Sequence, residues 1–328
     1  MIQKARQSNF ELLRLICMFM ILAAHASGYL NEADLIGGHG VFRLLVNQFC
    51  LVGVDVFVLI SGWFGIKASF RGAGKLLFQV LYVTVICLIV SLLAGLPVSF
   101  REDVLPSLLL GRSYWFVVSY MILFAISPVL NAFVEKATQE TFRTVLLVWF
   151  GLEFFYGFLL DAGHFDYGFS TLSFIGLYLL ARYVRLYPGR LSSFSAWTDA
   201  GIYTGLTLLS ALFFWYGYKW FGMGFHLNHY DSPLAILAAL YLLLAFSKIN
   251  LQSRTVNWLA ASAFAIYLIH EQDLVSPYYH QLFHNLGQWL PAPAVVPVAI
   301  ALLLLVGLAC ILIDKPREWL WRRITQAK

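Results

Sequence analysis

The chain has 328 residues, of which 60% are hydrophobic and only 12% are charged. Soluble domains carry about 25% charged residues, so this chain lacks the polar surface that a water-soluble fold needs. The formal net charge is +5, but the basic residues gather in the connections between hydrophobic segments. Their position indicates membrane topology, and we expect no nucleic-acid partner.

Ten hydrophobic segments are long enough to cross a bilayer, which takes about 20 residues per helix. Because an α-helix satisfies all its backbone hydrogen bonds within the segment, it is the only spanning form compatible with such long apolar runs. The segments are 10–30, 42–66, 75–96, 114–134, 142–160, 169–187, 197–218, 232–248, 256–275 and 294–314. The sequence predicts an all-α polytopic membrane protein of about ten transmembrane helices, with residues 1–328 forming one integral-membrane domain and no additional soluble domain.

The distribution of Lys and Arg predicts the orientation of these helices. If the amino terminus is inside, the inside connections hold 17 of the 22 basic residues, the outside connections hold four, and Arg14 lies within a helix. Because cytoplasmic loops carry an excess of Lys and Arg, both termini are predicted to be cytoplasmic.

The first segment carries two ionisable residues, Arg14 and His25, eleven positions apart. Eleven residues at about 100° each end about 20° past three full turns, so both side chains share one helix face, about 16 Å apart. Ionisable groups at this depth indicate a functional site. The alternative is that Arg14 reaches lipid headgroups and His25 bonds a neighbouring helix. Ser8 and Glu11 fit a capping box at the start of the helix.

The second segment places Asp55 close to the membrane midplane. A lone carboxylate there would be either protonated or paired, and we expect a partner such as Arg14 or a histidine. Farther along, Ser61 and Gly62 permit close approach of a thin ligand, although small residues in membrane helices also serve packing alone.

The segment 256–275 carries Tyr267-Leu-Ile-His270-Glu271 near its end. A continuous helix from residue 255 places His270 about 22 Å from the inner face, the depth of His25. The two imidazoles could therefore line one cavity. The alternative is that His270 sits at the outer interface beside Glu271.

Other polar and aromatic residues are weaker candidates. Trp115 and Tyr120 stand where an interfacial aromatic belt is common. The remaining histidines fall in predicted outside loops, and some have metal-compatible spacing, as in His226-x-x-His229. No cysteine or carboxylate framework accompanies them, so we expect no metal.

Three motifs together resemble membrane acyltransferase family 3. They are an arginine and a histidine separated by ten residues on the first helix, Gly-Val-Asp-Val-Phe-Val-Leu-Ile-Ser-Gly from Gly53 to Gly62, and Ile-Tyr-Leu-Ile-His ending at His270. The order and the spacing of the three motifs match the family, and the resemblance extends over nearly the whole chain. The family pattern often has a glycine before the last motif, where this chain has Leu259-Ala-Ala-Ser262.

The resemblance implies an O-acyltransferase that moves an acyl group, most often acetyl, from cytoplasmic acyl-coenzyme A to a hydroxyl of a cell-surface or lipid-linked glycan on the extracytoplasmic side. It also implies that the protein lies in the cytoplasmic (inner or plasma) membrane of a bacterium.

We assign roles to the motif residues as hypotheses. Arg14 contacts the donor phosphate or pantetheine amides, and His25 acts as general base, with a histidyl-acyl intermediate as the rival chemistry. Asp55 orients Arg14 or His25, and His270 holds the acceptor or shares the proton transfer. The donor passage is lined by Ser61 and Gly62, and Trp115 and Tyr120 stack on sugar or pantetheine.

Another class of function uses the same buried charges. A transporter or flippase for lipid-linked sugars would line its pathway with Arg14, Asp55 and Glu153. We find no inverted repeat and no paired helix breaks in corresponding halves, which favours the acyltransferase. Homo-oligomerisation is compatible with either function.

Overall fold

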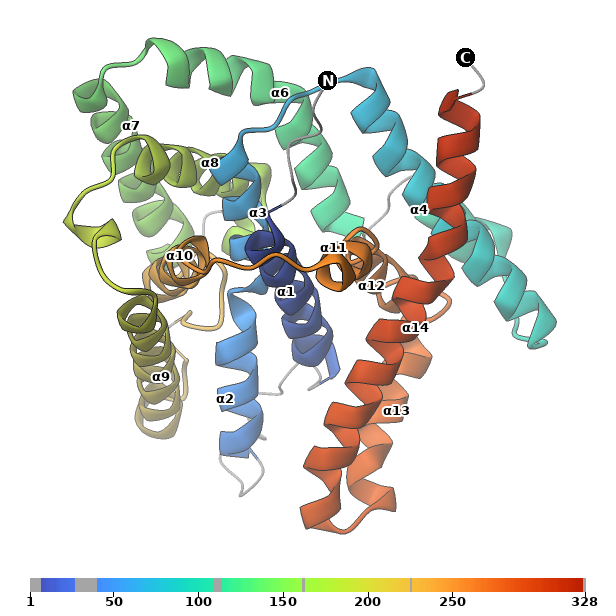
Figure 1. Ribbon diagram of the computed structural model, residues 1–328. Helices are drawn as coiled ribbons and strands as arrows, with labels where there is room; N and C mark the ends of the chain where they lie inside the picture. The colour runs from blue at the N-terminus through green and yellow to red at the C-terminus, as the bar shows by residue number, and fades with distance from the viewer. Residues whose placement is uncertain (1–6, 27–39, 109–113, 161–162, 225, 327–328) are drawn as a thin grey trace.

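The computed structural model describes residues 7–26, 40–108, 114–160, 163–224 and 226–326, and all regular structure among them is helical (Figure 1). The first half contains α1 Ser8–Ala26, α2 Gly40–Leu51, α3 Gly53–Phe64, α4 Phe70–Leu93, α5 Leu105–Leu108, α6 Trp115–Lys136 and α7 Gln139–Leu152. The second half contains α8 Thr171–Leu186, α9 Ala196–Phe221, α10 Pro233–Ser247, α11 Arg254–Ala260, α12 Phe264–His270, α13 Ser276–Trp289 and α14 Ala292–Gln326. Short π-helical turns lie at Phe100–Val104 and Glu153–Leu159, and 3₁₀ turns at Asp166–Gly168 and Arg190–Ser192.

Seven helical stretches in the described part of the chain are long and apolar enough to cross a membrane. They are Ser8–Ala26, Gly40–Phe64, Phe70–Leu93, Trp115–Lys136, Gln139–Leu159, Ala196–Phe221 and Pro293–Thr325. The protein is therefore a multi-pass membrane protein. Three of the ten predicted segments coincide with shorter helices, namely α8, α10 and the pair α11 and α12. The cytoplasmic placement of both termini stays a prediction.

The segment 256–275 is not one continuous helix. α11 ends at Ala260, a tight turn follows, and α12 begins at Phe264. In the turn, the amides of Ser262 and Ala263 donate to carbonyls three residues back, at 3.1 Å each. Such bonds close a narrower loop than the α-helix does and interrupt it. The depth predicted for His270 assumed an unbroken helix, and that assumption is wrong.

The last helix is longer than predicted. α14 continues from the apolar segment through Pro316 to Gln326, where the sequence suggested an end near residue 314. Its polar end packs back on α4, with the Trp321 ring 5.4 Å from that of Phe78. This contact supports the helix beyond its apolar part, because packing stabilises helices more than propensity does.

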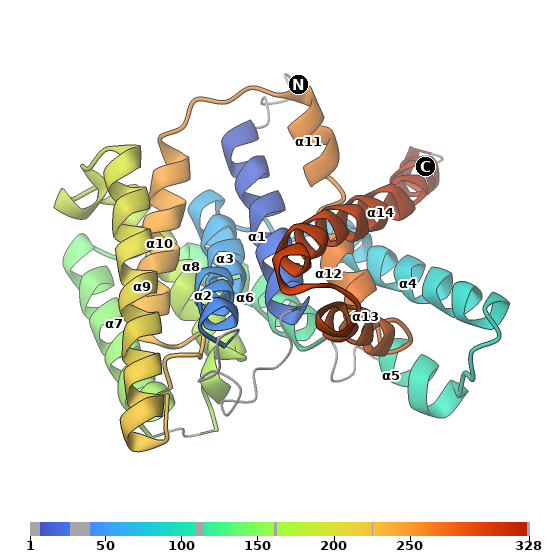
Figure 2. The ribbon, with the colours of Figure 1, turned by 90° about the horizontal axis from the view of Figure 1, so that it is seen from below.

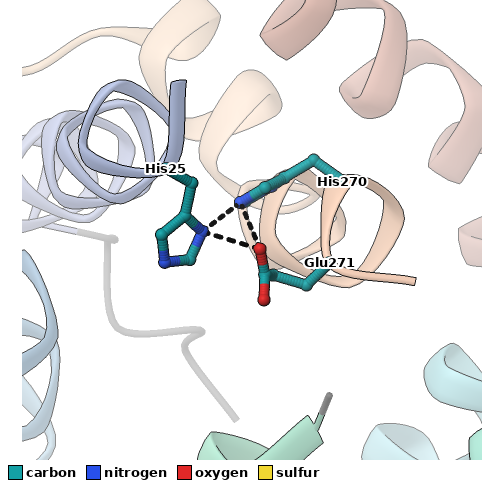
Figure 3. Close-up of side chains that lie close together, drawn as sticks. All are labelled: His25, His270 and Glu271. Carbon is teal, nitrogen blue, oxygen red and sulfur yellow. Dashed lines mark hydrogen bonds and ion pairs between the residues drawn. The ribbon is translucent and has the colours of Figure 1, made fainter. Parts of the chain in front are cut away.

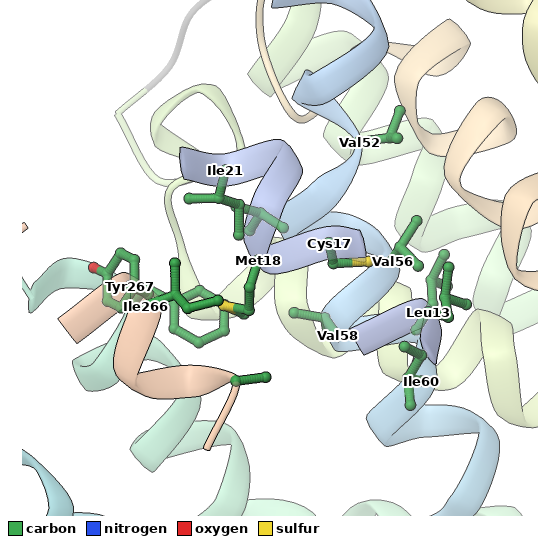
Figure 4. Close-up of a cluster of buried hydrophobic side chains, with 14 of the residues drawn as sticks. Leu13, Cys17, Met18, Ile21, Val52, Val56, Val58, Ile60, Ile266 and Tyr267 are labelled. Atoms are coloured by element: carbon green, nitrogen blue, oxygen red, sulfur yellow. The ribbon is translucent and has the colours of Figure 1, made fainter. Parts of the chain in front are cut away.

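Helix α1 lies inside the bundle, packed against α3 and α12 among others (Figure 2). Its buried side chains Leu13, Cys17, Met18 and Ile21 meet apolar residues of α3 and of α12 (Figure 4). Gly53, the first residue of α3, permits the close approach of α1, because a Cβ at this position would lie 3.0 Å from the carbonyl oxygen of Cys17. The helix that carries Arg14 and His25 is thus held on several sides.

The outward faces of the peripheral helices are apolar. Exposed side chains include Leu93 of α4, Val148 of α7, Leu212 of α9 and Leu305 of α14. Apolar exposure on this scale indicates contact with lipid, since a water-soluble monomer rarely presents large apolar patches. At 19 residues, α1 spans about 28 Å, close to the thickness of the hydrocarbon core.

Candidate functional site

Two histidines and a glutamate meet where α1 and α12 end (Figure 3). Nδ1 of His25 lies 2.8 Å from Nε2 of His270 and 2.8 Å from Oε1 of Glu271. Oε1 of Glu271 is 3.7 Å from Nε2 of His270. The prediction that the two imidazoles share one site agrees with this geometry, although they lie 245 positions apart in the chain.

The hydrogen bonds assign the protons of both rings. Nδ1 of His270 contacts the backbone carbonyl of Ile266, which can only accept, so this nitrogen carries the proton. In the neutral ring, Nε2 of His270 is then an acceptor. Since both neighbours of the His25 Nδ1 atom accept, that nitrogen carries the proton and Nε2 of neutral His25 has the free lone pair.

Burial separates the roles of the two histidines. The side chain of His270 is only 1% exposed, whereas those of His25 and Glu271 are 20% and 14% exposed. In Figure 3 the second ring nitrogen of His25 lies on the side of the ring away from Glu271. His25 therefore presents a ring nitrogen with a free lone pair on the more open side of the cluster, and His270 forms the wall behind it.

Helix α13 closes the site from another side. The Tyr279 ring centroid lies 5.3 Å from that of His270, and its hydroxyl donates to the carbonyl of Leu22 at 2.6 Å. This bond ties α13 to the turn of α1 that precedes His25. Because buried networks with satisfied donors fix their members, Tyr279 helps to set the position of the His25 backbone.

This arrangement suits general-base chemistry. A carboxylate bonded to Nδ1 holds the imidazole in one tautomer and stabilises the imidazolium that forms when Nε2 takes a proton. The group to be deprotonated must come within hydrogen-bond reach of Nε2. The cluster can therefore activate a hydroxyl for transfer.

Arg14 has different surroundings from His25. Its Nη1 atom pairs with Oε1 of Glu11 at 2.7 Å, and its guanidinium carbon lies 6.0 Å from the ring centroid of Phe64. Glu11 is thus engaged with Arg14. The capping box expected with Ser8 is not formed, because the Ser8 hydroxyl instead accepts from the backbone amide of Ser253 at 2.9 Å.

Asp55 is buried in α3, with 1% exposure, and it has neither of the expected partners. Arg14 pairs with Glu11 and His25 pairs with Glu271, while Oδ2 of Asp55 has no hydrogen-bond partner among the described residues. The charged groups that act on Asp55 are other carboxylates, including Glu153. Arg14 and His25 therefore do not pair with Asp55, and in the part of the chain that the structure describes the ion pair expected at this carboxylate is not formed.

Ser61 and Gly62 face neighbouring helices. The Ser61 hydroxyl lies 3.1 Å from that of Tyr120, which brings these two predicted site residues together. Gly62 lies against α8, where an added Cβ would be 2.4 Å from the carbonyl oxygen of Tyr178. The close approach that Gly62 permits is thus used for helix packing.

Trp115 belongs to an aromatic cluster near the start of α6. Its ring lies 4.6 Å from Phe169 and 6.1 Å from Tyr230, centroid to centroid. Phe116, the next residue, stacks on Tyr120 at 5.8 Å. The two predicted aromatic residues are therefore linked through Phe116, whose ring also lies 5.6 Å from that of Tyr267, a ring neighbour of His270.

Metal-type ligand atoms gather at the same site. The ligand atoms of His25, His270 and Glu271 lie within 4.8 Å of one another. Two histidines and one carboxylate are a common ligand set, but Zn–N bonds of about 2.0–2.1 Å hold tetrahedral ligands about 3.3 Å apart. At 2.8 Å, His25 Nδ1 and His270 Nε2 are at hydrogen-bond distance, which favours the hydrogen-bonded cluster of His25, His270 and Glu271 over a metal site.

Sequence reasoning missed Glu271 as a partner of His25. It follows His270 directly, but its adjacency in the chain does not reveal that α1 packs on α12. The available signal was the pair of adjacent ionisable residues at the end of an apolar segment, which predicts a site without naming the partner.

The fold and the site together define a polytopic membrane protein with a cluster of two histidines and a glutamate where α1 and α12 end. A family model described as an acyltransferase domain, that of acyltransferase family 3, matches residues 7–313. The chain belongs to this family, as its motifs indicated. No curated protein and no solved structure gave a match.

Proposed function

We propose that this protein is an integral-membrane O-acyltransferase that moves an acetyl group from cytoplasmic acyl-coenzyme A to a hydroxyl of a cell-surface or lipid-linked glycan. Family membership supports acyl transfer. The observation that carries the proposed chemistry is the pair of 2.8 Å contacts that hold His25 Nδ1 and leave the lone pair of Nε2 for an acceptor hydroxyl.

The proposed reaction is a direct transfer. Nε2 of His25 takes the proton of the acceptor hydroxyl as its oxygen attacks the thioester carbon. The new C–O bond forms, the C–S bond breaks, and the imidazolium returns the proton to the departing sulfur. Glu271 stabilises the imidazolium between these steps, since charge-assisted hydrogen bonds are stronger than neutral ones.

The other predicted residues take supporting roles in this proposal. Arg14 lies eleven residues before His25, about 16 Å away on α1, and contacts polar groups of the donor on its inner side. His270 holds the His25 ring from behind. Tyr120 and Ser61, joined by their hydroxyls, line the donor's path, Gly62 lets α3 pack closely on α8 beside them, and Trp115 stacks on the sugar.

In this proposal the protein lies in a bacterial cytoplasmic membrane, and donor and acceptor approach from opposite sides. With the amino terminus inside, His25 stands in the outer half of the bilayer, 17 residues beyond Ser8, or about 26 Å along α1. The donor enters from the cytoplasm and the glycan from outside.

The test uses membranes with radiolabelled acetyl-coenzyme A and a glycan extract from the same cells. We expect label in the glycan fraction with the wild-type protein, none with His25→Ala, and normal labelling with His284→Ala, which removes an exposed histidine of α13. Labelling by a folded His25→Ala variant refutes the base assignment. Absence of label with every acceptor, together with transport of lipid-linked sugar, supports the transporter alternative.

A further inference from the structure

A second site lies between the start of α4, helix α11 and the polar end of α14. It is a cavity of about 670 Å³. Its lining includes Arg71, Lys75, Trp258, Arg317, Trp321 and Arg322. His25, His270 and Glu271 are not part of this lining, so the cavity is distinct from the histidine cluster.

The cavity is positively charged. Four basic residues line it, and the acidic residue in the lining, Glu318, lies 3.8 Å from Arg322. Arg71 and Arg322 are exposed, which leaves both side chains accessible to a solute. An excess of guanidinium and ammonium groups in a concave surface favours a polyanion.

Arg317 supplies a buried donor at this cavity. Its side chain is fully buried, and Nε donates to Oδ1 of Asp314 at 2.9 Å. Asp314 also accepts from Nε2 of Gln79 at 3.1 Å. Nη1 of Arg317 has no hydrogen-bond partner among the described residues. A buried cationic donor without an acceptor is costly, and an anion in the cavity would satisfy it.

Two indole rings distinguish the kind of anion. Trp258 and Trp321 line the cavity from α11 and from α14. Lys315 lies over the Trp258 ring at 4.2 Å and helps to hold it. Aromatic side chains stack on the faces of nucleobases, whereas a phospholipid headgroup has no aromatic ring. The lining therefore favours a phosphorylated nucleotide over an anionic lipid.

The distance from the cavity to the histidines suits a tethered reactive group. Trp258 precedes His270 by twelve residues, of which about eight advance at the α-helical rise and four cross the turn at the steeper 3₁₀ rise, so the two residues lie no more than about 20 Å apart along the chain axis. An extended pantetheine arm has about thirteen bonds, each advancing about 1.25 Å, and so spans about 16 Å. A nucleotide held in the cavity would thus place its thioester near His25.

We propose that this cavity binds the phosphorylated adenosine of acyl-coenzyme A, with the guanidinium groups of Arg71, Arg317 and Arg322 on its phosphates. This inference rests on the proposed function only in naming coenzyme A as the donor. Guanidinium groups suit this role because their planar donors match phosphate oxygens bidentately.

The test measures binding without turnover. The purified protein in nanodiscs of phosphatidylcholine is titrated with coenzyme A and with adenosine 3′,5′-bisphosphate, as wild type and as the double variant Arg71→Gln/Arg322→Gln. We expect the double variant to weaken both ligands at least about tenfold, since it removes two charge-assisted contacts. The matched control is Arg323→Gln, because Arg323 stacks on Trp319 outside the cavity; we expect affinity within about twofold of wild type.

Three outcomes overturn the assignment. These are an unchanged affinity in the double variant, an equal loss in Arg323→Gln, and displacement of coenzyme A by phosphatidylglycerol in anionic nanodiscs, which would identify a lipid headgroup site. Arg317→Lys, which keeps the charge beside Asp314, provides a second variant if the double variant does not fold, and we expect it to weaken coenzyme A by about tenfold.

His25→Ala separates this proposal from the proposed function. We expect this variant to bind coenzyme A with wild-type affinity and to lack transfer. If the cavity variants retain a normal donor KM in the transfer assay, the binding site is refuted and the enzyme function stands. If coenzyme A binds at the cavity but no acceptor is acylated, the function is refuted and the site stands.

Discussion

Glu271→Gln gives the sharpest test of how the histidine cluster works. The substitution keeps the size of the side chain and an amide oxygen that accepts the proton on Nδ1 of His25. It removes only the negative charge that lies 2.8 Å from this nitrogen. The tautomer of His25 is therefore retained, while the imidazolium loses its counter-charge.

The expected loss follows from this contact. A hydrogen bond to a charged group contributes about 1.5–3 kcal/mol, which corresponds to about 10- to 150-fold in rate. His25 and Glu271 are 20% and 14% exposed, so water screens part of the interaction. We expect kcat to fall about 10- to 100-fold. The donor KM should not change, since the imidazolium forms only during the reaction.

The assay is steady-state acyl transfer by purified protein at several donor concentrations. Glu102→Gln, which removes an exposed carboxylate of the Phe100–Val104 turn, serves as the charge-matched control and should keep wild-type kcat. A folded Glu271→Gln variant with wild-type kcat would refute the role of Glu271. A rise in donor KM with unchanged kcat would place Glu271 in donor binding instead.

Other substitutions and treatments probe the remaining parts. Arg14→Lys keeps the charge but loses the planar fork; we expect a higher donor KM with little change in kcat, and unchanged donor kinetics would remove Arg14 from the donor site. Gly62→Ala places a Cβ 2.4 Å from the Tyr178 carbonyl oxygen, so thermal unfolding should show a loss of about 1–3 kcal/mol. Gly205→Ala, which meets nothing within 4 Å, should cause no such loss, and equal stability of the two variants would contradict the packing argument. Incubation with EDTA should leave transfer intact, because the cluster distances fit hydrogen bonds; metal in the pure protein together with loss of activity would identify a metal centre instead.

The composition was sufficient to predict a helical membrane protein, because a chain with so few charges cannot cover itself in water. The spacing of Arg14 and His25 also predicted their separation along α1, since a helix has a fixed rotation and rise. The ends of α11, α12 and α14 were not predictable in this way. They depend on a tight turn at Ser262 and on contacts of Trp321 with α4, which hydropathy does not register.

The sequence by itself determined the family, the helical class and the two histidines of the candidate site. Only the tertiary structure decided their partners. Glu271 was adjacent to His270 in the chain, yet its role depends on α1 packing beside α12, a contact between residues 245 positions apart. Asp55 was the residue for which a partner such as Arg14 or a histidine was expected, but Arg14 pairs with Glu11 and His25 with Glu271. Local spacing fixes which side chains share a helix face, whereas the pairing of charges is set by which helices meet.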